Sequence, residues 1–553
     1  MSPILRALRR VLGFALALSV APASAWAEWI DDPENPDRVE VAPSTADDSE
    51  DAWIDDPENP ASSPIHRAPP RAAALQCPSC PPPASWFRGS YRAGASVDFV
   101  RDHAQEETHA LDQDLTFRVR HRWEESTLDL EARFSWSIAM PGRDEDSVLL
   151  PQTRRARGEW QAELRQALWS RRWDRWLVRA GQQTIAWGSS DLLNPVDVIH
   201  PRDFRRGFAL TGSEGRLPVP ALRVTWLGEP FRADAVLVPV FVPHRVPLLT
   251  TRYALLRPPG PVADRAGLGE RVDGVLDPAV LPQVEALLLG TEPPAALPGN
   301  VSLGLRLTHT SPGQDISIGG YYGWERTPRV TLDPRTRDLL ELVGGGAPGA
   351  TPDLATLLSL LPLLGEAPRD LFRTTYDRRL WLLADGVRTM GPWALRAEAT
   401  YSPEANYTTR ALETLRRPAA AGTLGLSWEG DAENLLVSAE AFVLHTFREE
   451  EDGAAWLLPA TEVGIAGGLR VRPSAFTVWD TPAGRRWTLL AGGLWAAESA
   501  SLATSAQVSV EASERTQWSG GFTAFWSLGS GAEGLAAQLR SANHGFVRYE
   551  VVF

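Results

Sequence analysis

The stretch Leu128-Asp-Leu-Glu-Ala-Arg-Phe-Ser-Trp-Ser-Ile138 places an apolar side chain at every second position and a polar one between. This alternation predicts a β-strand with one apolar face and one polar face. Similar runs recur from residue 90 onward, and they predict about 18 strands. The predicted strands are 90–101, 113–123, 126–138, 157–168, 175–187, 219–228, 231–242, 300–311, 314–325, 378–389, 392–403, 420–429, 434–446, 459–472, 484–496, 502–513, 516–528 and 540–553.

The length and spacing of these strands predict a membrane protein. A tilted strand of roughly ten residues crosses a bilayer. Through the first twelve strands, short connections such as 228–230 and 311–314 alternate with longer ones, which is the asymmetry of bacterial outer-membrane barrels. We therefore predict an all-β fold, a transmembrane antiparallel β-barrel with both termini in the periplasm. A soluble sandwich or propeller would need a packed core between sheets or blade-length repeats.

Aromatic residues support the same fold. Tyr549, Val551 and Phe553 share one face of the last predicted strand, and they resemble the terminal aromatic signal by which outer-membrane barrels are recognised for assembly. The resemblance implies the barrel-assembly machinery as a partner. The 22 tryptophans suit the aromatic girdles that barrels place at the two membrane interfaces.

The N-terminal residues predict export and an extended periplasmic segment. Residues 1–27 combine three early arginines, a short apolar run and small residues at the end, the pattern of a secretory signal peptide. Residues 28–86 are acidic and rich in proline, and this composition predicts disorder. The barrel is predicted to occupy 87–553, in the cell outer membrane after cleavage of the signal peptide.

Two features of the acidic segment remain open to more than one interpretation. The octapeptide WIDDPENP occurs at 29–36 and again at 53–60. It is either a docking motif for a periplasmic partner or a duplicated spacer. Cys77 and Cys80 are the two cysteines, which form either a local disulfide or free thiols, and two ligands are too few for a complete zinc site.

The composition excludes several functions. The formal charge is −14 and the sequence contains no lysine, which argues against nucleic acid as a partner and excludes lysine Schiff-base chemistry. No apolar run after the signal peptide is long enough for a membrane helix. The nine histidines are scattered and no G-x-S-x-G motif occurs, so we expect no enzyme, no cofactor and no resident metal.

Charged residues of the second predicted hairpin alternate with its apolar ones. With a turn at 124–127, Arg122 would face Asp129, Arg120 would face Glu131, and Arg118 would face Arg133. Arginine at the bilayer midplane costs about 2–4 kcal/mol, so these side chains are predicted to point into the lumen. They form either an electrostatic constriction or a structural charge ladder. The predicted ladder comprises Arg118, Arg120, Arg122, Asp129, Glu131 and Arg133.

The loop after the fifth predicted strand, 188–218, carries an unusually ordered set of turn-forming residues. Gly188 permits a sharp turn, and Asn194-Pro195 and His200-Pro201 force extended, kinked backbone. Aspartates at 191, 197 and 203 can cap turns or pair with arginine. We predict an inward-folded constriction; a loop that only caps the mouth and a calcium site remain alternatives. The candidate residues are Gly181, Gln182, Gln183, Trp187, Gly188, Asp191, Asn194, Asp197, His200, Pro201, Arg202 and Asp203.

The same residues carry a resemblance. The stretch resembles a poorly characterised family of bacterial outer-membrane barrels, often encoded beside RND-type exporters of lipids or hydrophobes, with G-R-Q-x-[VI]-x-W-G followed by D-x-x-x-x-D-[VI]-[IV]-N-P-R-D. Gln182 stands where that motif has arginine, and His200 where it has asparagine. More distantly, Arg179, Gly181 and Gln183 are similar to a strand of 18-strand alginate-export barrels.

The resemblance implies transport of a hydrophobic molecule. Two further long outer loops, 243–299 and 326–377, contain apolar segments that predict short helices. These helices resemble the substrate-capturing patch of long-chain fatty-acid channels, or they pack on each other as a plug. We expect an outer-membrane channel for a hydrophobic or lipid-like small molecule. The alternative is a polar-solute porin or polysaccharide-export channel. An RND-type exporter or a periplasmic protein that binds the N-terminal repeat is a further expected partner.

Overall fold

The computed structural model describes residues 85–98, 109–140, 157–190, 192–204, 215–246, 300–327, 329–332, 372–408, 414–430, 435–449, 460–471, 487–513, 515–528 and 539–553. The predicted signal peptide, the repeat, both cysteines and the apolar segments within 247–299 and 333–371 lie outside the described residues. So do the helices predicted for the outer loops. Among the described residues, no helix is long and apolar enough to cross a membrane.

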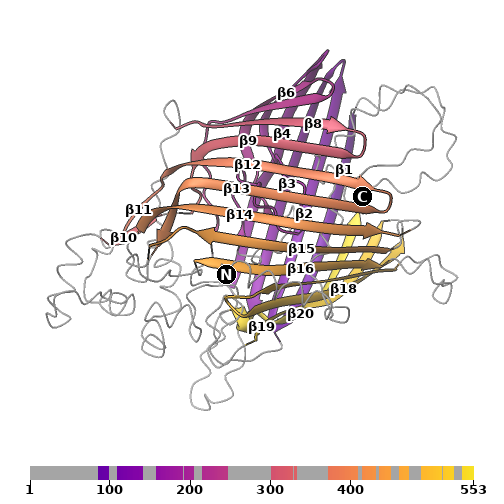
Figure 1. Cartoon of the computed structure of the whole chain (residues 1–553). Coiled ribbons are helices and arrows are strands. Elements are labelled where there is room, and N and C mark those ends of the chain that lie inside the picture. Colours follow the sequence, from indigo (N-terminus) through magenta and orange to yellow (C-terminus); the bar gives the residue numbers. More distant parts are fainter. Residues whose placement is uncertain are drawn as a thin grey trace.

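Eighteen antiparallel strands form one closed barrel (Figure 1), which confirms the predicted fold. Each strand of the barrel pairs with the barrel strands before and after it in the chain, β9 with β12 included. Because β1 pairs with both β2 and β20, the sheet has no edge. The strands are β1 (Ser85–Asp98), β2 (His109–Trp123), β3 (Ser126–Met140), β4 (Arg157–Trp173), β5 (Trp176–Gln183), β6 (Val219–Leu227), β7 (Phe231–Val238), β8 (Ser302–Ser311), β9 (Gln314–Trp324), β12 (Arg378–Met390), β13 (Trp393–Thr408), β14 (Thr414–Glu429), β15 (Leu435–Thr446), β16 (Thr461–Val471), β17 (Trp487–Ala496), β18 (Ser501–Ser513), β19 (Thr516–Ser527) and β20 (His544–Val552).

Among the described residues, three small elements lie outside the barrel wall. The strands β10 (Arg329–Leu332) and β11 (Phe372–Thr375) pair with each other between β9 and β12. A short 3-10 helix, η11 (Leu539–Ala542), precedes β20. We call the end of the barrel with the connections 124–125, 174–175 and 391–392 the turn end, and the opposite end the loop end.

The two faces of the wall differ in polarity because successive side chains of a strand point to opposite sides. On β8, Leu303 and Leu305 point outward and are 52% and 66% exposed, whereas Arg306 and Thr308 point inward and are buried. Ile318 on β9 is also 60% exposed. An outer surface of this kind suits contact with hydrocarbon, and the polar side chains line the interior.

Tryptophans gather near both ends of the outer face. Trp123 ends β2 and Trp173 ends β4 at the turn end. Towards the loop end, Trp160 of β4 pairs with Trp136 of β3, and Trp526 lies near the end of β19. Trp160 is 80% exposed. This distribution is typical of two interfacial aromatic girdles.

Replacing the lipid-facing Leu305 with arginine is expected to lower the free energy of unfolding by about 2–4 kcal/mol, because a guanidinium in the hydrocarbon loses its hydration. Equilibrium urea unfolding of the protein in lipid vesicles measures this change. Leu305→Ala is the control for lost apolar contact, and it should cost clearly less. Equal stability of the arginine and alanine variants would contradict a lipid-facing position for Leu305.

The pairing of β2 with β3 differs from the prediction by two residues. The hairpin turns at Glu124-Glu125, and Glu124 adopts a φ of 50°, so Trp123 pairs with Ser126. Arg120 therefore faces Asp129, Arg118 faces Glu131 and Arg122 faces Thr127. All three predicted pairings, Arg122 with Asp129, Arg120 with Glu131 and Arg118 with Arg133, are wrong. The left-handed residue allows a two-residue turn where four residues were expected. A shift of two leaves each side chain on its predicted face.

The barrel closes where β1 meets β20. Ser90 pairs with Val552, and Gly89 exchanges two backbone hydrogen bonds with Phe553, at 2.8 and 2.9 Å. The Phe553 ring is 51% exposed and meets Phe117 edge-on, with ring centroids 6.4 Å apart. The C-terminal aromatic residue thus lies on the outer face, next to the closure.

Candidate functional site: a segment across the barrel interior

The chain leaves the barrel wall after β5 and enters the interior. Gly188 has a φ of +110°, a conformation that side-chain-bearing residues rarely adopt. A Cβ at this position would overlap Asn194 Oδ1 and Glu398 Oε1. Gly188 therefore permits both the turn and the close approach. We call residues 188–190 and 192–204 the crossing segment; Asp191 lies outside the described residues.

The far side of the barrel holds the start of the crossing segment through two buried glutamates. Glu398 on β13 accepts hydrogen bonds from the backbone N–H groups of Ser189 (2.5 Å), Ser190 (2.6 Å) and Val196 (3.3 Å). Glu440 on β15 accepts two more, from Leu192 (3.1 Å) and Leu193 (2.9 Å).

The strand order shows how far the crossing segment reaches. Between β5 and β15 lie β6, β7, β8, β9, β12, β13 and β14. The hydroxyls of Ser190 and Thr423, on the intervening β14, lie 2.7 Å apart. The Ser189 hydroxyl donates to the Gly386 carbonyl of β12 at 3.2 Å. The segment thus spans the interior instead of standing above the mouth.

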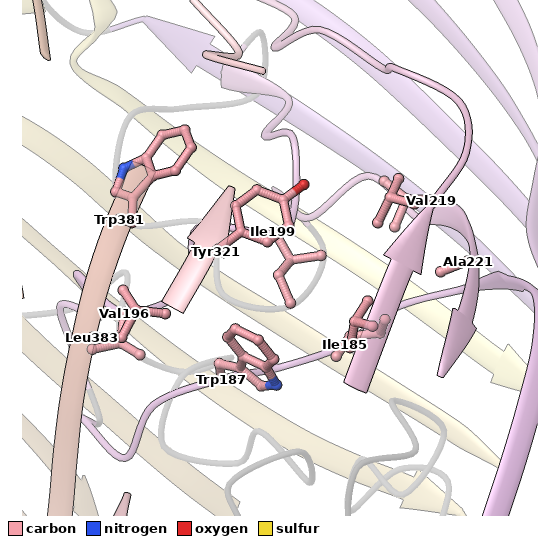
Figure 2. Close-up of a cluster of buried hydrophobic side chains, with 11 residues drawn as sticks. Ile185, Trp187, Val196, Ile199, Val219, Ala221, Tyr321, Trp381 and Leu383 are labelled. Carbon is pink, nitrogen blue, oxygen red and sulfur yellow. The ribbon is translucent and has the colours of Figure 1, made fainter. Parts of the chain in front are cut away.

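A hydrophobic cluster packs the crossing segment against the inner wall between β6 and β12 (Figure 2). Trp187, Val196 and Ile199 are fully buried. The Trp187 ring lies over Gly304 of β8, where an added Cβ would be 2.7 Å from its Cη2 atom. The cluster comprises Ile185, Trp187, Val196, Ile199, Val219, Ala221, Val236, Val238, Tyr321, Trp381 and Leu383. An apolar sector therefore covers part of the inner wall, from β6 to β12.

His200 links the start and the end of the connection between β5 and β6, and its ring is uncharged. Its Nε2 atom accepts a hydrogen bond from the Ile185 N–H at 2.5 Å. Nδ1 must then carry the proton, which it donates to the Leu217 carbonyl at 3.0 Å. Burial lowers the pKa of His200 to about 4, although nearby Asp197 opposes the shift. The neutral ring acts as one acceptor and one donor.

The crossing segment should loosen in acid because of His200. Its pKa of about 4 in the fold lies below the ordinary 6.5, so its stabilising effect is full above pH 6.5 and is lost as the pH falls towards 4. The loss is at most about 3 kcal/mol. Hydrogen exchange of peptides covering 185–200, corrected for intrinsic rates, measures it. His200→Asn, which keeps an acceptor and a donor but does not titrate, should remove this pH dependence; an identical dependence in both proteins would refute the assignment.

Two aspartates of the crossing segment form ion pairs with arginines. The Asp197 carboxylate binds Arg202 at 2.7 Å and Arg216 at 2.8 Å. Burial alone would raise the pKa of Asp197, but these two guanidiniums outweigh burial and lower it. Asp203 binds Arg245 at 3.2 Å. The described aspartates thus lie against arginines, and the described residues contain no cluster of three or more His, Cys, Asp or Glu that could hold a metal.

Arg326 and a small backbone network complete the support. Arg326, buried beyond β9, donates to the carbonyls of Ile199 and Val242, both at 2.6 Å. Asn194 Oδ1 accepts the Asp197 N–H at 2.9 Å and forms a local turn. Next to Pro201, the backbone of 202–203 bridges to Arg216 on one side and Arg245 on the other.

The motif residues on β5 are part of the barrel wall, and their side chains bond to neighbouring backbone. Gln183 is buried and donates to the Ala221 carbonyl of β6 at 2.9 Å. Gln182 donates to the Leu164 and Pro218 carbonyls, each at 3.4 Å. Gly181 has a φ of +126°. The structure therefore places Gly181, Gln182 and Gln183 near the point where the crossing segment leaves the wall, which we call its base. It does not bring them to Glu398 or Glu440.

The predicted charge ladder lies on the inner face of β2 and β3. Asp129 binds Arg118 at 3.0 Å and Arg120 at 2.7 Å, and Arg133 binds Asp114 at 2.7 Å. Arg118 also lies 4.0 Å from Glu131. Arg122 occupies the same face, at the turn end, opposite Thr127.

Other functional candidates were missed by the sequence reasoning. Arg223 pairs with Asp234 at 3.1 Å and Arg306 with Asp385 at 2.7 Å, which continues the lumen charges around the wall. Charged residues at alternate positions of facing strands are a signal that could have found Arg223 and Asp234. Arg306 and Asp385 lie on β8 and β12, with β9 between them, so this signal does not reach that pair. No sequence signal separates Glu398 and Glu440 from other inward carboxylates.

A family profile described as "Protein of unknown function (DUF1302)" matches residues 85–529. A search of curated proteins gives no match. The match covers the barrel from β1 to the end of β19, including the crossing segment.

The chain is similar to several solved structures over most of its length. OccAB3 of Acinetobacter baumannii is 8% identical over 85% of this chain and 99% of that chain, with a TM-score of 0.41. OmpF of Salmonella typhi, solved in complex with daunomycin, is 8% identical over 85% and 97%, with a TM-score of 0.37. OprB of Pseudomonas putida is 11% identical over 85% and 94%, with a TM-score of 0.36.

Proposed function

The chain belongs to the family described as a protein of unknown function (DUF1302), and from the architecture of its barrel we propose that it is a non-enzymatic outer-membrane channel for a small hydrophobic or lipid-like molecule. The observation that carries the proposal is the crossing segment, which spans the interior from β5 to β15. Barrels of 16–18 strands enclose a lumen wide enough for solutes. A segment fixed within such a lumen narrows it.

The membrane location is supported by the outer face and by the N-terminal sequence. Exposed leucine and isoleucine side chains such as Leu305 and Ile318 cover the outside of the wall, where water would disfavour them. The predicted signal peptide would bring the chain to the periplasm. We propose that Tyr549, Val551 and Phe553 then engage the barrel-assembly machinery.

The hydrophobic substrate is supported by the apolar sector of the inner wall. Barrel interiors are generally polar, yet Val219, Val236 and Trp381 turn inward here and pack under the crossing segment. Val242, towards the loop end, is partly buried against the same cluster. The apolar sequences within 247–299 and 333–371 would supply a capture surface, and an RND-type exporter or another periplasmic protein would be a partner at the N-terminal repeat.

A polar-solute porin or polysaccharide channel is the second candidate. It is favoured by the pairs Arg118–Asp129, Arg223–Asp234 and Arg306–Asp385 on the inner wall. Charged rings of this kind select among polar solutes in other channels.

Two measurements separate the candidates. Deletion of the gene should change the uptake or export of a radiolabelled fatty acid or sterol, and the plasmid-borne gene should restore it. Liposomes that contain the purified protein should swell slowly or not at all in sugar solutions. Rapid swelling with sugars, together with unchanged handling of both hydrophobes, would select the porin.

A further inference from the structure

We propose that Glu398 and Glu440 set the aperture of the channel by holding Ser189, Ser190, Leu192 and Leu193 against the far wall. We call these four residues the tip. The inference rests on the proposed channel function, and it makes the two glutamates positioning residues of the constriction.

The tip is bound to the far wall by hydrogen bonds from its backbone N–H groups to the carboxyl oxygens of two buried glutamates. Glu398 Oε1 accepts from Ser189 and Ser190, while Glu440 uses one oxygen for Leu192 and the other for Leu193. Glu398 is 4% exposed and Glu440 is 2% exposed. Losing the acceptor would leave buried N–H groups unsatisfied, at a cost to the free energy of holding the tip in place.

The base of the crossing segment is anchored by other means. Trp187 and Ile199 are seated in the apolar cluster, His200 bonds to Ile185 and Leu217, and Arg326 binds the Ile199 carbonyl. These contacts belong to the wall from β5 to β12. The tip can therefore leave β13 and β15 while these contacts stay in place. The hydroxyl contacts of Ser189 with β12 and of Ser190 with β14 must then break, and the buried Leu192 side chain must be exposed.

Glutamine at either position weakens the hydrogen bonds that hold the tip, without changing the size of the side chain. Both oxygens of Glu440 accept N–H groups, and so do both oxygens of Glu398. An amide keeps one acceptor and turns an N–H₂ group towards a backbone donor. The bond lost and the repulsion gained both favour release of the tip.

The experiment is single-channel conductance of the purified full-length protein in planar bilayers. The Glu398→Gln/Glu440→Gln double variant should conduct roughly twofold more than the wild type or better, because the narrowest part of a pore limits its conductance. Glu462→Gln is the matched control. Glu462 is an inward, buried glutamate of β16 that accepts backbone N–H bonds from Glu498 and Ser499 in the short turn before β18. It should conduct like the wild type.

A reversible crosslink tests the position of the tip directly. The Ser190 and Thr423 hydroxyls are 2.7 Å apart, so Ser190→Cys/Thr423→Cys places two thiols together. Both native cysteines are first replaced, as Cys77→Ser/Cys80→Ser. In the double glutamine variant, oxidation should restore the low conductance and a reductant should raise it again. Such rescue also shows that the barrel is folded.

The outcomes separate the inference from the proposed function. A conducting wild type with an equally conducting double glutamine variant would overturn the role of the two glutamates and leave the channel intact. A crosslink that forms without lowering the raised conductance would overturn it too. Absence of conductance from wild type and all variants would overturn the channel proposal and this inference together.

Discussion

Replacing Trp187 with alanine is expected to lower the free energy of unfolding by about 3–5 kcal/mol, the cost of truncating a large buried aromatic residue. The Trp187 ring is fully buried and lies over Gly304. Gly304 contributes no side chain that could fill the space that the ring leaves. The base of the crossing segment should then lose its seat on the wall.

Urea unfolding in detergent micelles measures the global effect of Trp187→Ala, and hydrogen exchange of 185–199 measures the local one. Trp160→Ala is the control, since Trp160 is 80% exposed on the outer face. It should change stability in micelles by much less and should leave exchange of the crossing segment unaltered. Similar behaviour of the two variants would show that Trp187 is not a structural anchor.

Gly188→Ala is the second variant with a large expected effect. An alanine at a φ of +110° is strained by about 1–3 kcal/mol. In addition, the new Cβ overlaps Asn194 Oδ1 and Glu398 Oε1, and displacing the glutamate leaves N–H groups of the tip unsatisfied at a further cost of roughly 1–3 kcal/mol. We expect the conductance of single channels to rise.

Gly391→Ala provides the comparison for Gly188→Ala. Gly391 also has a positive φ, +61°, but its added Cβ meets nothing within 4 Å. It lies in a turn at the turn end of the barrel, far along the chain from the crossing segment. Unchanged conductance for Gly391→Ala and raised conductance for Gly188→Ala are the expected pair of results. If neither variant differs from the wild type, the close fit at Gly188 has no bearing on the pore.

The sequence was sufficient for the barrel because one face of each strand meets an apolar environment. That asymmetry repeats with a period of two and can be read strand by strand. It was insufficient for the register of β2 and β3, because a shift of two residues preserves every face. Only the conformation of Glu124 distinguishes the two-residue turn from the four-residue one.

The candidate site was partly predictable. An ordered loop is predicted by the backbone preferences of Gly188, Asn194 and His200-Pro201. The partners of this loop are not local: Ser189 meets a glutamate 209 residues later and Leu192 one 248 residues later. Alternation shows that Glu398 and Glu440 point inward, but it does not show which of the many lumen side chains the loop will meet.

His200 illustrates how a departure from a motif can preserve its physical role. The resembled motif has asparagine at this position. The neutral His200 ring accepts from Ile185 and donates to Leu217, and an asparagine amide also offers one acceptor and one donor group. Charge is therefore not needed at this position.

The seam between β1 and β20 has a consequence for biogenesis. Arg92 and Glu550, which bond across it, are 458 residues apart in the chain. The barrel can close only after β20, the last strand, is available to pair with β1. Contacts between residues so distant in the chain form slowly. We therefore expect the chain with its seam still open, and its apolar strands exposed, to be prone to aggregation for longer than a small barrel is.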